Sequence, residues 1–197
     1  MLAVESGSEQ LTRAIRSLEA AFLIGVEGVC EVWLVRHADC YEGLTEPGDP
    51  PLSALGRRQA ALLAERVRRA GPAAVYSSPY RRALETARAI TDDVRVDPRL
   101  IEMELGIKED GTFDLPGDAT EVVERMRAAL QDIAREHAGR RVVVIGHAAA
   151  IVATLTDILH LEHGQLRMLP YFTSVSVLRV LGDRTMVGGL TDVAHLE

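Results

Sequence analysis

Apolar positions recur along the chain in two alternating patterns, short unbroken runs and longer amphipathic stretches. Runs at residues 31–35, 73–76, 94–96 and 141–145 are typical of short strands, and the Val/Ile run 141–145 of one buried on both faces. Residues 53–70, 78–91, 119–137 and 148–159 are predicted helices. Residues 174–180 and 185–190 flank Gly182-Asp183 as a closing hairpin. This alternation predicts an α/β three-layer sandwich, a mostly parallel sheet with helices on both faces.

Capping residues mark where two of these helices begin. Ser53 is the expected N-cap of the helix over 53–70, and Gly71-Pro72 ends it. Ser78 is the expected N-cap of the next helix, with Pro79 in the first helical position, where its missing N–H costs nothing.

The first 28 residues differ from the rest of the chain. Residues 8–23 predict an amphipathic helix with one apolar stripe, formed by Leu11, Ile15, Leu18 and Phe22. We therefore divide the chain into an N-terminal helical extension, 1–28, and one domain, 29–197. Three roles stay open for the extension: an added packing helix, the contact of a homodimer, or a segment translated from a misassigned start codon.

Composition narrows the class of protein. A chain of 197 residues with 47% hydrophobic content is sufficient for one core, and a net charge of −7 argues against a nucleic-acid partner. Cys30 and Cys40 flank a predicted strand, are poorly placed for a disulfide, and indicate reduced thiols. No apolar run is long enough for a membrane span, and Glu5 and Glu9 precede any basic residue, unlike a secretory signal. We expect a cytoplasmic protein with no membrane partner.

Three polar segments follow three of the predicted strands. They contain Arg36 and His37, Ser78 and Arg82, and His147. Because the carboxyl ends of parallel strands share one edge of a sheet, these side chains should converge there. Guanidinium groups match phosphoryl oxygens, and neutral imidazole is a competent nucleophile for phosphorus. A helix start near Ser78 would add N–H donors. The sequence therefore predicts a phosphoryl-transfer site.

These segments resemble the signatures of the histidine phosphatase superfamily, also called phosphoglycerate mutase-like. The family's strand ending in Arg-His-Gly stands here as residues 34–38, and its Ser-Ser-Pro-x-x-Arg-Ala-x-x-Thr-Ala matches residues 77–87 throughout. Its Leu-x-Glu-x-x-x-Gly matches residues 100–106, and its Gly-His-Ala matches residues 146–148. Leu52-Ser53-x-x-Gly56 also fits, so the resemblance spans residue 31 to the C-terminus.

The resemblance implies a mechanism. His37 attacks phosphorus in line and becomes a phosphohistidine, while Arg36, Arg82 and His147 cradle the phosphoryl oxygens. Glu102, favoured over Glu104 by motif register, protonates the leaving oxygen and then activates water. No metal or other cofactor is required, and two arginines beside the site would oppose a divalent cation.

Two positions depart from the family pattern. Ala38 replaces the glycine after the first histidine, and Gly43 stands where many members carry an asparagine that holds the phosphate. We expect Ser78 or a backbone N–H to compensate.

The short segment between Glu102 and Gly146 favours a phosphatase over a mutase. Its loop is acidic, which would repel a bisphosphorylated substrate, and it contains Glu109, Asp110, Asp114 and Asp118. Sugar phosphates, phosphorylated cofactor precursors, nucleotides and phosphoproteins stay open as substrates. The alternatives are a phosphoglycerate mutase-type phosphotransferase, a weakly catalytic protein that binds phosphorylated ligands, and a noncatalytic scaffold.

Overall fold

The computed structural model describes residues 7–42, 48–104, 106–107, 109–110, 113–114, 118–162 and 164–197. The helices and strands predicted from the sequence form in the expected order, together with short elements that were not predicted, three of them in the segment 97–118 expected to be a loop. They are α1 Gly7–Ala21, β1 Cys30–Arg36, α2 Ala54–Ala70, β2 Ala74–Ser77, α3 Arg81–Arg88, β3 Val94–Val96, η1 Pro98–Leu100, β4 Gly106–Ile107, β5 Phe113–Asp114, α4 Thr120–Glu136, β6 Arg141–Gly146, α5 Ala148–Ile158, β7 Val175–Leu181, β8 Arg184–Asp192 and η2 Ala194–Leu196.

One sheet of six strands, in the order β3-β2-β6-β1-β7-β8, organises the molecule. The first four strands in this order pair in parallel, whereas β7 is antiparallel to β1 and β8 is antiparallel to β7. The predicted hairpin is therefore confirmed, and Gly182 provides the positive φ of 62° at its turn. The pairing confirms a mostly parallel sheet, with its antiparallel strands at one edge.

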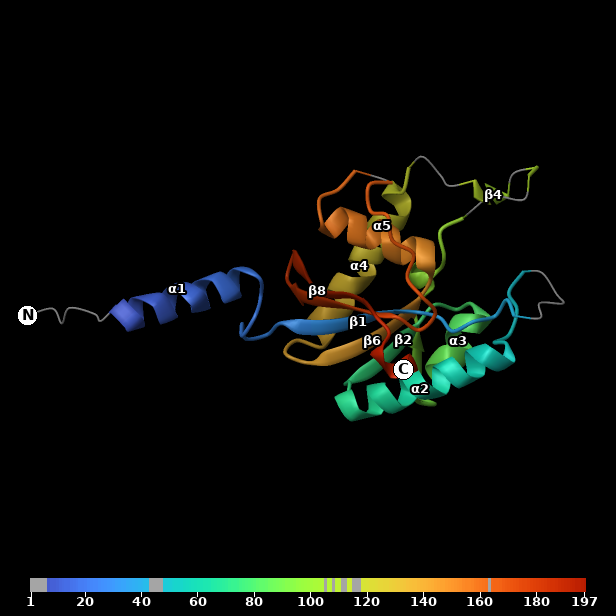
Figure 1. The fold of residues 1–197 in the computed structure, drawn as a ribbon, viewed down its shortest axis with the longest axis horizontal. Coiled ribbons are helices and arrows are strands. Elements are labelled where there is room, and N and C mark those ends of the chain that lie inside the picture. The colour runs from blue at the N-terminus through green and yellow to red at the C-terminus, as the bar shows by residue number, and fades with distance from the viewer. Residues whose placement is uncertain are drawn as a thin grey trace, which may run out of the picture.

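Alternate residues of the central strands enter two separate apolar clusters. Val142 and Val144 of β6 pack with α4 and α5, while Val143 and Ile145 pack with α2 and α3. Figure 1 shows the same division, with α4 and α5 above the sheet and α2 and α3 below it. The predicted three-layer sandwich is confirmed, and β6 is buried on both faces, as its unbroken Val/Ile run predicts.

Capping explains one predicted helix boundary and fails for another. Ser53 Oγ accepts a hydrogen bond from the Gly56 N–H at 2.9 Å, and Gly71 closes α2 in the left-handed conformation, as predicted. The prediction that α3 begins at Ser78 is wrong, because α3 begins at Arg81 with Tyr80 as its N-cap. Ser78 Oγ accepts from the Tyr80 N–H at 3.3 Å and also lies 2.8 Å from His147 Nε2, so it stabilises the turn before α3 and contacts the site as well.

The N-terminal helix forms as the sequence predicts, but its apolar stripe is exposed. Leu11, Ile15, Leu18 and Phe22 are each about half exposed or more, between 48% and 63%. In Figure 1, α1 extends away from the sheet, and Arg184 donates to the Ala21 carbonyl at its end. No helix among the described residues is long and apolar enough to span a membrane. Cys30 and Cys40 are buried free thiols.

Candidate active site

The carboxyl ends of β1, β2 and β6 bring three predicted site residues together. These strands are neighbours in the sheet, and His37, Ser78 and His147 follow them directly. The backbone N–H of His37 donates to the Gly146 carbonyl at 2.9 Å, and that of Ser78 donates to the Ile145 carbonyl at 3.0 Å. All three side chains are buried. With Arg36 and Arg82 they form a group that we call the phosphate cluster.

The His37 ring is held in one tautomer. Its Nδ1 lies 2.8 Å from the Ala38 carbonyl, which can only accept, so Nδ1 carries the proton and Nε2 keeps its lone pair. Arg82 Nε donates to that Nε2 at 3.3 Å. Burial, with the nearby charges of Arg82 and Arg36, lowers the pKa of His37 to about 3. The imidazole is therefore neutral, which is the form that attacks phosphorus.

His147 directly follows β6 and lies beside His37. Its ring centroid lies 5.2 Å from that of His37, and its Nε2 is 2.8 Å from Ser78 Oγ. Burial lowers its pKa well below the usual value, and neighbouring His37 and Arg82 add to the shift. Its Nδ1 is buried without a hydrogen-bond partner.

The two arginines come from different elements, Arg36 from the end of β1 and Arg82 from α3. Arg36 Nη1 donates to the Pro170 carbonyl at 2.7 Å, and its guanidinium lies 3.9 Å from the centre of the Phe172 ring. Among the described residues, three buried side-chain polar atoms lack a partner: Arg36 Nε, His147 Nδ1 and Ser174 Oγ. Buried polar groups are normally paired, so two unpaired nitrogens in the phosphate cluster fit the binding of an anion.

Asp49 also contacts the site, although no pattern along the chain indicates it. Its carboxylate accepts from Arg82 Nη1 at 3.0 Å and from the Arg81 backbone N–H, at the start of α3, at 2.6 Å. It thereby occupies donors that would otherwise suit a phosphate. The Asp49 side chain is 41% exposed, so it can turn away into solvent.

Two helices hold the backbone that follows His37. Thr86 of α3 accepts from the Ala38 N–H at 3.0 Å, and Gln59 of α2 accepts from the Asp39 N–H at 2.9 Å. A Cβ on Gly56 would lie 1.9 Å from the Asp39 carbonyl oxygen, so only glycine permits this approach. Ala38 is buried and does not have positive φ, so its backbone does not require the family's glycine.

Glu102 reaches the start of α5, beside His147. Its Oε1 accepts from the backbone N–H groups of Met103 at 2.8 Å and Ala150 at 2.9 Å. Its Oε2 accepts from the Ala149 N–H at 3.3 Å only. Glu104 is exposed. The carboxylate of Glu102 is therefore fixed within one helical turn of the phosphate cluster.

Some of the predicted features lie beyond what the structure shows. Gly43 is outside the described residues, as is the side chain of Asp114. The other acidic loop residues, Glu109, Asp110 and Asp118, are exposed. Within the described ranges, no group of three or more His, Cys, Asp or Glu side chains could hold a metal ion.

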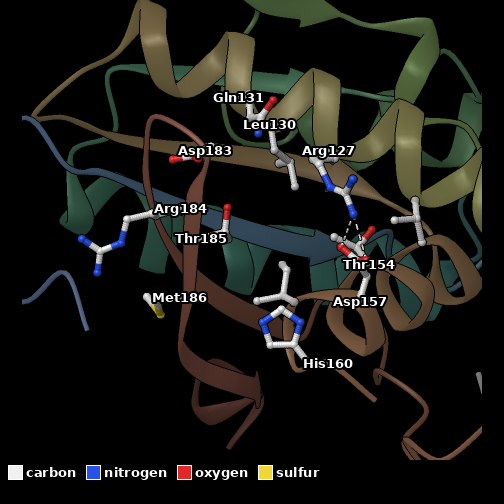
Figure 2. A pocket seen from close by; sticks show the side chains of 12 residues that line it. Arg127, Leu130, Gln131, Thr154, Asp157, His160, Asp183, Arg184, Thr185 and Met186 are labelled. Atoms are coloured by element: carbon white, nitrogen blue, oxygen red, sulfur yellow. Dashed lines mark hydrogen bonds and ion pairs between the residues drawn. The ribbon is translucent and has the colours of Figure 1, made fainter. Parts of the chain in front are cut away.

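A separate groove of about 480 Å³ lies between α4, α5 and the β7–β8 hairpin (Figure 2). It is lined by His160 but by none of the five residues predicted to be catalytic. Its Arg127 donates to both carboxylate oxygens of Asp157 at 2.8 Å. The predicted phosphoryl chemistry thus belongs to the sheet edge and not to this groove.

Comparison with known proteins finds a family model and relatives that match most of the chain. The model of the histidine phosphatase superfamily (branch 1) matches residues 32–116 and 116–192. A probable phosphoglycerate mutase of Proteus mirabilis is 30% identical, over 83% of this chain and 96% of that protein.

Solved structures with the same fold carry both phosphatase and phosphoglycerate mutase names. Phosphoserine phosphatase from Entamoeba histolytica, in complex with 3-phosphoglyceric acid, superposes with a TM-score of 0.71 at 19% identity, covering 85% of this chain and 100% of that one. Mycobacterial glucosyl-3-phosphoglycerate phosphatase superposes with a TM-score of 0.68 at 23% identity, covering 84% and 100%.

Proposed function

Because the chain belongs to the histidine phosphatase superfamily, we propose that it is a phosphomonoesterase that works without a metal ion, through a phosphohistidine on His37. The observation that carries this proposal is the state of His37. Its buried, neutral ring directs the Nε2 lone pair toward the Arg82 guanidinium, which would hold the phosphoryl group being attacked.

The first half-reaction transfers the phosphoryl group to the protein. The Nε2 lone pair of His37 forms a bond to phosphorus while the bond from phosphorus to the ester oxygen breaks. Arg36, Arg82 and His147 stabilise the charge on the three equatorial oxygens, with Ser78 beside His147. Glu102 gives its proton to the departing oxygen, so that an alcohol leaves and a carboxylate remains.

The second half-reaction reverses these roles. Glu102, now a carboxylate, removes a proton from a water molecule that attacks phosphorus. The bond between phosphorus and Nε2 breaks, inorganic phosphate leaves, and His37 is again neutral with its lone pair on Nε2. The two arginines would oppose a divalent cation in the same place, which supports a reaction that uses no metal.

Charge favours hydrolysis over the mutase reaction. Asp49 binds Arg82 and the start of α3, and its negative charge would repel a second anionic group on the substrate. The mutase name of the curated relative keeps phosphoryl transfer between two hydroxyls as the alternative. We expect a substrate with one phosphate group, on a small molecule or on a protein side chain.

Hydrolysis of 4-nitrophenyl phosphate in the presence of EDTA tests the proposal. Wild-type protein should release phosphate, and His37→Ala should not. His160→Ala is the matched control, because His160 lies in the separate groove, and it should retain full activity.

Other outcomes would select the alternatives. Vanadate binding without turnover of any ester would identify a phospho-ligand binding protein. Movement of labelled phosphate between the hydroxyls of phosphoglycerate would identify a mutase. The cytoplasmic location stays a prediction.

A further inference from the structure

One arginine outside the phosphate cluster holds the backbone that carries Glu102. Arg125 projects from α4, and its Nη1 donates to the carbonyls of Arg99 at 2.7 Å and Ile101 at 2.8 Å. Its Nη2 donates to the carbonyl of Glu102 itself at 3.1 Å. The Arg125 side chain is only 12% exposed, and its Nε lies 3.0 Å from Glu121 Oε1 on the same helix.

The hydrogen bonds of Arg125 hold a segment of the chain that has no regular secondary structure. Residues 101–104 lie between η1 and β4 and belong to neither a helix nor a strand. No ladder of backbone hydrogen bonds therefore fixes the direction in which Glu102 points. Arg125 holds the backbone side of this segment, and the Ala149 and Ala150 N–H groups hold the carboxylate side.

We propose that Arg125 is a positioning residue, which keeps the Glu102 carboxyl group where its proton reaches the leaving oxygen of the substrate. The inference rests on the proposed function. A planar guanidinium suits the role because two of its nitrogens reach three carbonyls at once, whereas an ammonium group presents its donors from a single point.

The dependence on the leaving group separates positioning from a general structural role. The first half-reaction, which kcat/KM reports, depends on the leaving group, whereas hydrolysis of the phosphohistidine is common to both esters. A nitrophenolate ion leaves without a proton and an alkoxide needs one, so a misplaced acid lowers kcat/KM only for the alkyl ester. General acid catalysis contributes about a hundredfold or more. Arg125→Gln should therefore lower kcat/KM for benzyl phosphate by about a hundredfold and kcat/KM for 4-nitrophenyl phosphate by less than about fivefold.

Arg127, two positions further along α4, provides a matched control. Arg127 pairs with Asp157 near the end of α5 and lines the separate groove, as the dashed lines in Figure 2 show. Arg127→Gln also removes an arginine that links α4 to α5, but it does not touch residues 99–102. It should leave the rates of both esters unchanged.

Two further variants link the effect to Glu102. Glu102→Gln should show the same selective loss on benzyl phosphate. Adding Arg125→Gln to it should cause no further loss, because the group being positioned is already absent. Arg125→Lys should keep part of the rate, and it carries the comparison if Arg125→Gln does not fold.

Two results would overturn the inference: an equal loss of kcat/KM on both esters, or full additivity with Glu102→Gln. Wild-type protein that hydrolyses neither ester would instead contradict the proposed function. Amide hydrogen exchange tests whether Arg125 positions Glu102 even if the protein hydrolyses neither ester. The Ala149 and Ala150 amides should exchange faster in Arg125→Gln than in Arg127→Gln, and equal rates would refute it.

Discussion

Acid should destabilise this protein through its buried histidines, and the effect can be assigned to His37. Burial lowers the pKa of His37 from its usual 6.5 to about 3. Between these two values, the unfolded chain binds a proton on this residue that the folded chain does not. Stability contributed by the neutral ring is therefore fully present above pH 6.5 and is lost as the pH falls toward 3.

The size of the effect follows from one proton. A difference of one bound proton changes the free energy of unfolding by about 1.4 kcal/mol per pH unit. For His37 the whole interval amounts to about 5 kcal/mol, of which about 1 kcal/mol falls between about pH 5.5 and about pH 4.5. Burial also lowers the pKa values of His137, His147 and His195, so the total slope is steeper.

His37→Asn isolates the contribution of His37. An amide side chain does not titrate, and its N–H can donate to the Ala38 carbonyl in place of Nδ1. Urea unfolding at several pH values from about 6 to about 4.5 measures each slope. The other histidines are present in both proteins, so the slope of the variant should be shallower by about 1 kcal/mol per pH unit. Equal slopes would show that the folded protein protonates His37 readily, which would contradict a neutral nucleophile.

Three other changes test separate parts of the structure. Asp49→Asn removes the negative charge beside Arg82. Because an exposed ion pair contributes up to about 1 kcal/mol, this variant should be inhibited by vanadate about fivefold more strongly. Asp93→Asn makes the same charge change at an exposed site and should have no effect. Gly56→Ala should cost about 3 kcal/mol in urea unfolding, because its Cβ would lie 1.9 Å from the Asp39 oxygen, whereas Gly189→Ala has open space and should cost little. The apolar stripe of α1, formed by Leu11, Ile15, Leu18 and Phe22, has the spacing of a coiled coil. Because an isolated helix of 15 residues is only marginally stable in water, α1 should pack against a second copy. The full chain should therefore sediment as a dimer, and a chain starting at Gly28 should sediment as a monomer. A monomer in both cases would exclude the dimer.

Local patterns were enough to predict most elements and the phosphate cluster. Strand composition locates β1, β2 and β6, and the rule that carboxyl ends share one edge brings His37, Ser78 and His147 together. The helix start at Ser78 could not be predicted in the same way. Its hydroxyl accepts from the local Tyr80 N–H at 3.3 Å and also lies 2.8 Å from His147 Nε2, and only the folded structure shows this second contact.

The roles of Asp49 and Arg125 could not be predicted from the sequence, for a related reason. Each acts through partners distant in sequence, which no periodicity reveals: Asp49 contacts Arg82, and Arg125 contacts the carbonyls of residues 99–102. From the sequence alone, Arg125 would be interpreted as one more charged residue on the polar face of α4. Only its contacts with residues 99–102 in the folded structure distinguish it from Arg127.

The two carboxylates at the site occupy equivalent places with different consequences. Asp49 accepts from the first N–H of α3, and Glu102 accepts from the second and third N–H groups of α5, so each lies at the positive end of a helix. The Asp49 side chain is 41% exposed, so an incoming phosphate can displace it from Arg82. Glu102 is held at its backbone by Arg125 as well as at its carboxylate, so it should stay in place when the anion binds. In the proposed reaction, the group that must move is therefore exposed, and the group that must deliver a proton is held on two sides.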